Sequence, residues 1–495
     1  MSENGQRPSV AWGTSAGMKL DPDACYRAVT ARDGRFDGLF FVAVRTTGIY
    51  CRPVCRARTP GRDRCVFYRT AAQAERDGFR ACFRCRPELA PGSAPVDSVP
   101  RLVREAAARI EAGALNEGDV EALAAQLGVS GRHLRRAMIS ELGVSPVELA
   151  QTRRIGLAKH LLQDTSMPVS EIALASGFRS IRRFNALFRT RFGRAPTALR
   201  RARPSAVSDE AISLTLDYRA PFDWGAMLAF LRPRATPGVE AIRGETYLRT
   251  ARVGNHRGWL AVAPMAERPA LRAEVSFSLA PALMPIVARL RRLFDLDAQP
   301  ELIAKQLAND PDLLRWVRAR PGLRVPGAFD GFETAARAVL GQQVTVAAAT
   351  TFAGRVAATL GEPIDTPHPE LSRLWPAPER VAREPAEALS ALAILPSRAR
   401  TLRQLASAVA RGELILSPLA DVETALQKLQ ELPGIGPWTA QYVAMRALGW
   451  PDAFPESDLG IRKALGGAST GEARRRAERW RPWRAYGAMH LWVST

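Results

Sequence analysis

Four cysteines of this chain form two close pairs, and all six of its cysteines precede residue 86. Three residues separate Cys51 from Cys55, and two separate Cys82 from Cys85. Each pair can chelate one metal ion, so the two pairs predict a tetrahedral four-thiolate site of the kind that binds Zn²⁺. Disulfides fit less well, because the polar N-terminus has no apolar segment of the kind that directs secretion. Spacing alone leaves open whether the zinc site is reactive or purely structural.

A glycine-rich turn near the C-terminus is the second candidate for chemistry. It reads Leu432-Pro-Gly-Ile-Gly-Pro-Trp-Thr-Ala440 and lies between two segments that we predict to be helices. Gly434 and Gly436 permit a hairpin whose backbone N–H groups meet at the start of the second helix. Such a hairpin suits a phosphate group and reads no base. A plain connection between helices would satisfy the glycine pattern equally well.

The charge of the chain points to a polyanionic partner. Its net charge is +21 and its pI is about 10.8, a balance that favours nucleic acid. No apolar run approaches the roughly 20 residues that a membrane span requires. We therefore expect a nucleic-acid partner, DNA or RNA, and no membrane. The expected location is the cytoplasm, in association with the nucleoid, where thiols stay reduced.

Two stretches rich in proline, serine and small residues, 90–100 and 203–209, divide the chain. The predicted fold is multidomain. Its expected parts are a disordered N-terminus (1–18), a small α/β four-cysteine zinc domain (19–90), an all-α tandem helix-turn-helix domain (101–203), an α+β domain with an antiparallel sheet (210–295) and an all-α helix-hairpin-helix domain (296–495). Period-two alternation in the segments of the sheet predicts one buried face and one face in water.

The middle of the chain contains one helix-turn-helix pattern twice, in residues 120–138 and 169–184. Gly128 and Gly177 mark the turns, and in such a motif the second helix enters the major groove. The tandem resembles the AraC-type DNA-binding domain. The resemblance implies that the arginines on the polar side of each second helix face DNA: Arg132, Arg135, Arg136, Arg179, Arg182 and Arg183.

The cysteine-bearing head is similar to the N-terminal domain of the Ada methylation-response family. The matching residues are the run Val44-Arg-Thr-Thr-Gly-Ile49, the motif from Cys51 to Arg58, and the motif from Gly78 to Cys85. The resemblance implies a zinc-bound thiolate, assigned to Cys51, that takes a methyl group from a DNA methyl phosphotriester. It also implies transcription activation, with RNA polymerase as a further partner. The methyltransferase domain that repairs O6-alkylguanine in that family has no counterpart here, so we expect no such repair.

The last 285 residues, 211–495, resemble the helix-hairpin-helix DNA glycosylases of the AlkA type. The string from Leu432 to Ala440, Phe222-Asp-Trp224 and Ala477-Glu-Arg-Trp-Arg-Pro-Trp-Arg484 carry the match. The resemblance implies that Asp458 is the catalytic carboxylate. It also implies a base pocket of Trp438, Tyr442, Trp492 and Phe230, and DNA contacts from Gln343, Gly434, Gly436 and Thr439.

Three details refine this expectation. Superfamily members that also cleave the DNA backbone carry a Schiff-base lysine where this chain has Trp438, so a monofunctional hydrolase is implied. Gln343 stands where related enzymes place a leucine that fills the gap left by the extruded base, and Leu459 replaces an expected aromatic residue beside Asp458. The resemblance also allows a monovalent cation at the hairpin.

Taken together, the sequence predicts a monomeric fusion of a methylation sensor, a transcription activator and a 3-methyladenine DNA glycosylase. The alternative from another functional class is a DNA-binding activator whose glycosylase half recognises damage without catalysis. A second alternative is a head in which zinc only stabilises the fold.

Overall fold

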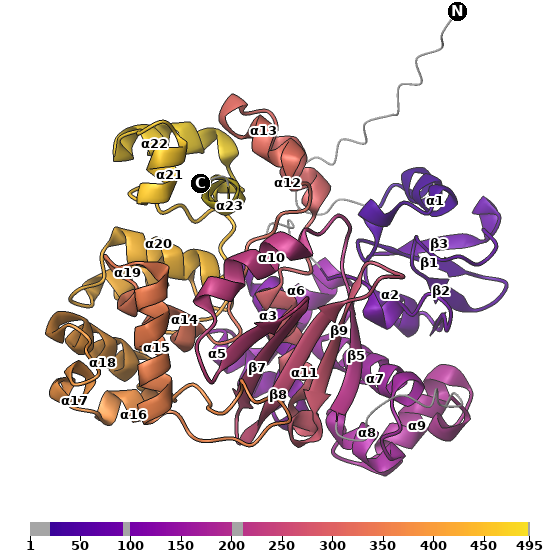
Figure 1. Ribbon diagram of the computed structural model, residues 1–495. Coiled ribbons are helices and arrows are strands. Elements are labelled where there is room, and N and C mark those ends of the chain that lie inside the picture. Colours follow the sequence, from indigo (N-terminus) through magenta and orange to yellow (C-terminus); the bar gives the residue numbers. More distant parts are fainter. Residues whose placement is uncertain (1–19, 93–99, 200–210, 494–495) are drawn as a thin grey trace, which may run out of the picture.

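The computed structural model of the chain describes residues 20–92, 100–199 and 211–493 (Figure 1). The expected disordered N-terminus, 1–18, lies outside these residues, as does most of both proline-rich stretches. Within the described ranges, no helix combines the length and apolar character that a membrane crossing requires.

The head is a four-stranded sheet with one helix on each side. The strands are β1 (Phe41–Val44), β2 (Ile49–Cys51), β3 (Cys65–Tyr68) and β4 (Arg80–Ala81), in the order β3-β1-β2-β4, and only the β2–β4 pair is parallel. Helix α1 (Pro22–Ala31) buries Cys25 and Val29 against β1 and β3. Helix α2 (Ala71–Arg76) begins at a capping box of Thr70 and Gln73.

The middle of the chain is all-helical and contains both predicted helix-turn-helix units. Its helices are α3 (Arg101–Glu111), α4 (Ala114–Glu117), α5 (Val120–Gln126), α6 (Gly131–Leu142), α7 (Pro146–Asp164), α8 (Val169–Ala175) and α9 (Ile181–Phe192). Gly128 and Gly177 adopt positive φ at the two turns, which a side chain would strain. Ser130 and Ser180 then cap α6 and α9 by accepting backbone hydrogen bonds.

A five-stranded antiparallel sheet forms the centre of the molecule. Its order is β5-β9-β8-β7-β6, from β5 (Ala211–Asp217), β6 (Glu240–Arg243), β7 (Thr246–Val253), β8 (His256–Pro264) and β9 (Ala270–Ser276). Helix α10 (Trp224–Leu231) connects β5 to β6.

The prediction that one whole face of this sheet lies in water is wrong. Residues 247–251 of β7 are buried without alternation. The expected alternation appears in β5, where Ser213 and Thr215 are half-buried, and in β9, where Arg272 and Glu274 are exposed. The cause is a loop from the helical region that folds back over the second face, where Leu371 packs with Leu248 and Trp259. A sequence period cannot reveal a cover supplied from more than 100 residues away.

The remaining chain is helical and carries the predicted hairpin. Its helices are α11 (Leu283–Leu293), α12 (Pro300–Leu307), α13 (Pro311–Ala319), α14 (Gly331–Leu340), α15 (Val346–Leu360), α16 (Pro378–Arg383), α17 (Ala386–Ser390), α18 (Pro396–Ala410), α19 (Val422–Glu431), α20 (Pro437–Arg446), α21 (Leu459–Ala464), α22 (Thr470–Ala477) and α23 (Arg484–Trp492). Helices α14 to α22 and the head lie on opposite sides of the central sheet (Figure 1).

Packing joins these parts into one body. A single cluster of buried apolar side chains runs from Phe41 in the head through Phe188 of α9 and Leu260 of β8 to Leu491 in α23. The first helix-turn-helix unit has a separate core around Leu123, Leu134 and Met138.

Candidate functional site

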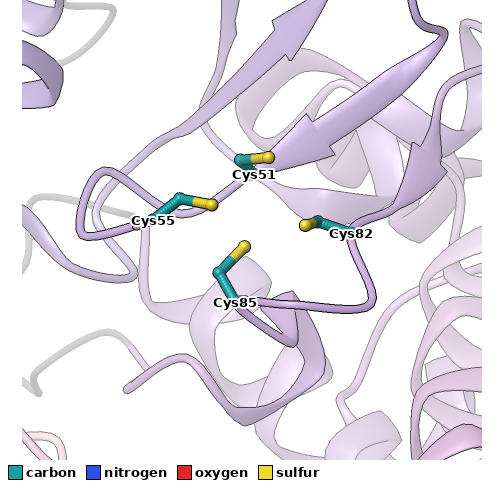
Figure 2. Close-up of side chains that lie close together, drawn as sticks. All are labelled: Cys51, Cys55, Cys82 and Cys85. Carbon is teal, nitrogen blue, oxygen red and sulfur yellow. The ribbon is translucent and has the colours of Figure 1, made fainter. Parts of the chain in front are cut away.

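The four paired cysteines meet at one point in the head. Cys51 ends β2, Cys82 follows β4, and Cys55 and Cys85 come from the adjacent loops. Their Sγ atoms all lie within 4.8 Å of one another and point toward a common centre (Figure 2). Tetrahedral Zn²⁺ with Zn–S bonds of about 2.3 Å places sulfurs roughly 3.8 Å apart, so this cluster fits the ion with little adjustment.

Electrostatics explain why this cluster needs a cation. Hydrogen bonding among the four thiols spreads their pKa values, lowering those of Cys55 and Cys82 while raising those of Cys51 and Cys85. The backbone N–H of Arg52 also donates to Cys85 Sγ at 3.4 Å. Four such close sulfurs cannot all be thiolates unless a positive ion lies between them.

The other two cysteines lie outside this cluster. Cys25 and Cys65 are buried in the apolar core of the head. Burial raises the pKa of Cys25 to about 12, which leaves its thiol protonated and unreactive.

A cavity of about 240 Å³ opens beside the hairpin, and Asp458 lies on its wall. Asp458 caps the short helix α21, and its Oδ1 accepts a hydrogen bond from the Ile461 N–H at 3.0 Å. Two indoles complete the set: Trp438 Nε1 donates to Oδ2 at 2.8 Å, and Trp492 Nε1 donates to Oδ1 at 2.9 Å. The carboxylate is therefore fixed in direction by three donors.

Three of the four predicted pocket aromatics line the cavity. The rings of Trp438 and Tyr442 stack with their centroids 5.4 Å apart and an interplanar angle of 12°. The ring centroid of Trp492 lies 6.2 Å from that of Tyr442. Phe230 is 5% exposed and does not line the cavity. It stacks behind Trp492 at 6.3 Å and supports that ring.

The neighbouring acids have structural roles. Asp452 is buried and ion-paired with Arg484 and Arg481. Glu456 pairs with Arg474. Neither lines the cavity, which leaves Asp458 as its one carboxylate among the described residues.

The hairpin and the turn before α15 are tied together. Gly434 and Gly436 are exposed between α19 and α20, as expected for a phosphate contact. Gln343 is exposed at φ 54° in the turn that ends α14. The preceding Gln342 donates to the Gly434 carbonyl at 2.8 Å and to the Thr439 hydroxyl at 3.0 Å. Thr439 is buried, so its side chain positions this turn and does not face solvent.

The six arginines that the sequence predicts to face DNA are all exposed. They are Arg132, Arg135 and Arg136 in α6, with Arg179 just before α9 and Arg182 and Arg183 within it. Arg135 forms an ion pair with Glu121 at 2.8 Å.

Leu459 is 77% exposed beside Asp458, where an apolar side chain would normally avoid water.

Sequence reasoning missed three arginines that line the cavity: Arg234, Arg337 and Arg446. A signal for two of them exists, because Arg234 follows Phe230 by four residues and Arg446 follows Tyr442 by four residues in α20. This spacing places both members of each pair on one side of a helical segment.

The C-terminal half, with its hairpin and cavity, has the helix-hairpin-helix DNA glycosylase fold. It is joined to a four-cysteine zinc domain and a tandem helix-turn-helix domain. Three family models match the chain: the metal binding domain of Ada at 24–88, a helix-turn-helix domain at 123–202 and the AlkA N-terminal domain at 213–330. A 3-methyladenine DNA glycosylase structure from Archaeoglobus fulgidus has the same fold, with a TM-score of 0.50 and 21% identity over 57% of this chain and 97% of its own.

Similar proteins of known sequence agree with these matches. A probable bifunctional transcriptional activator/DNA repair enzyme AlkA of Mycobacterium tuberculosis is 41% identical over 96% of this chain and 97% of its own length. DNA-3-methyladenine glycosylase 2 of Escherichia coli is 40% identical over 57% of this chain and 96% of its own. The bifunctional activator/repair enzyme Ada of Escherichia coli is 39% identical over 27% of this chain and 37% of its own. The chain therefore belongs to the AlkA family of bifunctional transcriptional activator/DNA repair proteins, and its four clustered cysteines form a zinc site.

Proposed function

We propose that the C-terminal half hydrolyses the N-glycosidic bond of alkylated bases in double-stranded DNA, as a monofunctional 3-methyladenine DNA glycosylase. The observation that carries this proposal is the Asp458 carboxylate, fixed by Trp438 and Trp492 at the wall of a cavity beside the hairpin. No lysine lines that cavity within the described residues, which agrees with hydrolysis without a Schiff base.

The geometry suggests how the reaction proceeds. A damaged base must leave the duplex stack to enter the cavity. As its bond to C1′ breaks, positive charge grows on the sugar, and the Asp458 carboxylate stabilises that charge and orients water. Both carboxylate oxygens already accept hydrogen bonds, so this group acts chiefly through its charge. Gln343, held out at the tip of its turn, would fill the gap in the duplex.

Base release from methylated duplex DNA tests this proposal. Asp458→Asn should lower single-turnover release at least about 100-fold, because the charge is lost and an amide donor faces an indole donor. Glu456→Gln is the matched control and should keep the native rate. No release by the native protein would instead support the alternative, an activator with a non-catalytic glycosylase half.

We further propose that Cys51 accepts a methyl group from a DNA methyl phosphotriester. Zinc, when bound by Cys51, Cys55, Cys82 and Cys85, keeps their thiols deprotonated. The Cys51 sulfur would bond to the methyl carbon while the C–O bond breaks, and the electron pair would stay on the phosphate oxygen. The formal charge of the cluster would change from −2 to −1, which weakens repulsion of DNA.

Intact-protein mass spectrometry tests the transfer. Native protein exposed to methyl-phosphotriester DNA should gain the mass of one CH₂ and keep one zinc, whereas Cys51→Ala should gain none. Cys65→Ser, which changes a buried cysteine outside the cluster, should behave as native. An unmodified native head would leave the zinc with a structural role only.

The helix-turn-helix units supply promoter binding in this proposal. The exposed arginines of α6 and α9 carry the charge that a duplex requires. The chain would act as a monomer in the cytoplasm, associated with the nucleoid, and would contact RNA polymerase.

A monovalent cation at the hairpin would share carbonyls that already accept hydrogen bonds from Thr401 and Gln342. Comparing base release in potassium chloride and choline chloride tests that cation.

A further inference from the structure

The floor of the base cavity is formed by guanidinium groups around one phenol. Arg234, Arg337 and Arg446 line the cavity together with Tyr442. Arg446 Nη1 donates to Tyr442 Oη at 2.7 Å, and its remaining donors engage the carbonyls of Pro326 and Gly327.

Only one of these three arginines is neutralised. Arg337 forms ion pairs with the buried carboxylates of Glu240 and Glu333. Arg234 donates to the Phe230 carbonyl at 2.9 Å and lies 3.9 Å above the ring of that residue. Among the described residues, neither Arg234 nor Arg446 has an acidic partner. Two uncompensated positive charges therefore face a cavity whose one carboxylate, Asp458, lies on its wall.

This charge is the opposite of what a cationic base would need. A base that carries a fixed positive charge gains from the aromatic rings but is repelled by Arg234 and Arg446. A neutral base that presents oxygen or nitrogen lone pairs gains from both, because N–H and O–H donors face its edge.

We propose that Tyr442 and Arg234 are specificity-determining residues that bind the lone-pair edge of a neutral purine lesion. In this proposal Arg446 positions the Tyr442 hydroxyl and, together with Arg234, adds the positive charge that stabilises the departing base. This inference rests on the proposed glycosylase function and adds to it the class of leaving group that the floor favours.

The two kinds of leaving group differ in charge. When the C1′–N bond of an alkylated, cationic purine breaks, the electron pair cancels the positive charge and the base leaves neutral. When the same bond of a neutral purine breaks, the electron pair makes the base anionic. Water adds to C1′, and the proton it loses ends on the base. Only the second route gains from positive charge at the floor, since the anion forms before that proton arrives.

The state of Tyr442 supports this role. Burial acts to raise the pKa of Tyr442, but Arg446, Arg234 and Arg337 together lower it below the usual value of a phenol. A more acidic hydroxyl is a stronger donor. Its oxygen accepts from Arg446, so its own proton is free to reach a base in the cavity.

The test compares two duplexes, one with hypoxanthine as the neutral probe and one with 7-methylguanine as the cationic probe. Tyr442→Phe keeps the stacked ring and removes only the donor. We expect it to lower kcat for hypoxanthine release roughly 10- to 100-fold, and to lower 7-methylguanine release by a clearly smaller factor. Arg234→Gln should act in the same direction and should lower KM for the cationic probe.

Each outcome bears on the inference. An equal loss on both probes would show that Tyr442 is only structural, and an unchanged hypoxanthine rate would exclude its role as a donor. Either result overturns the inference and leaves the glycosylase function in place. Release of neither base by the native protein would overturn the proposed function, and this inference with it.

Discussion

At the scale of single residues, the direction of one carboxylate is set by two indoles. Trp438 and Trp492 donate to different oxygens of Asp458, and the Ile461 N–H shares Oδ1. The aromatic side chains that the family resemblance placed in the pocket therefore have a second task. They orient the charged group as well as lining the cavity.

Trp492→Phe should separate these two tasks, because it keeps a ring in the cavity and removes one donor to Asp458. A hydrogen bond to a charged group contributes about 1.5–3 kcal/mol, so we expect kcat for base release to fall at least about 10-fold with little change in KM. Trp375→Phe is the control, since that indole N–H is buried without an acceptor within the described residues and does not line the cavity. An equal effect of both substitutions would contradict the positioning role.

A buried carboxyl group gives a prediction about pH. Burial raises the pKa of Asp295 to about 7, and its Oδ2 accepts from Tyr486 Oη at 2.7 Å. Since the unfolded chain ionises this group near pH 4, its contribution to stability is full below pH 4 and is lost as pH rises through 7. As the pH rises from 5 to 8, the free energy of unfolding measured in urea should fall by about 2 kcal/mol more for the native protein than for Asp295→Asn. Parallel curves for the two proteins would show that the group ionises normally when folded.

At the scale of elements, the hairpin is held from two sides. Gln342 reaches it from the end of α14, and Thr401 of α18 donates to the Pro433 carbonyl at 2.8 Å. This support explains why a short glycine turn can keep its N–H groups in a fixed direction. The same link joins the hairpin to the turn that carries Gln343, so we expect the proposed phosphate contact and the residue proposed to fill the duplex gap to keep a constant separation.

The two glycines of the hairpin should respond differently to alanine. Gly434 has φ 90°, and an added Cβ would lie 2.2 Å from Thr401 Oγ1, so Gly434→Ala should cost about 2 kcal/mol of folding stability and weaken DNA binding. At Gly436 an added Cβ meets no atom within 4 Å, so Gly436→Ala should leave stability nearly unchanged. Thermal unfolding measures the stability of both variants, and fluorescence anisotropy with duplex DNA measures their DNA binding. Equal stability of the two variants would show that the hairpin is not constrained by α18.

At the scale of the whole molecule, a buried ion cluster joins the zinc domain to the central sheet. Arg52, adjacent to Cys51, donates Nε to Asp37 at 2.8 Å and Nη1 to Asp217 of β5 at 2.6 Å. The Arg52 Nη1 also donates to the Cys85 carbonyl at 3.3 Å. Asp217 is in turn paired with Arg268. The loop that carries the zinc ligands is therefore fastened to the sheet on which the glycosylase half is built.

Asp217→Ala should loosen this junction. Removing one partner of a buried ion pair costs about 3–5 kcal/mol, because Arg52 and its neighbours stay buried. Scanning calorimetry should show a separate, lower-temperature transition for the head, with zinc retained. Glu370→Ala removes an exposed partner of Arg243 and should leave the profile unchanged. A single transition at the native temperature would mean that the apolar contacts alone hold the two parts together.

The sequence by itself determined the features whose signals are local. Cysteine spacing, serine caps after glycine turns and the glycine hairpin are each set by a few neighbouring residues, and the zinc ligands, both helix-turn-helix units and the hairpin could be predicted from them. Tertiary structure alone decided which distant groups meet. The covered second face of the sheet depends on Leu371, the cavity floor on Arg234 and Arg337, and the interdomain ion cluster on Asp217. Charge and burial act through space, so a single sequence does not show which guanidinium finds a carboxylate and which remains unpaired beside Tyr442.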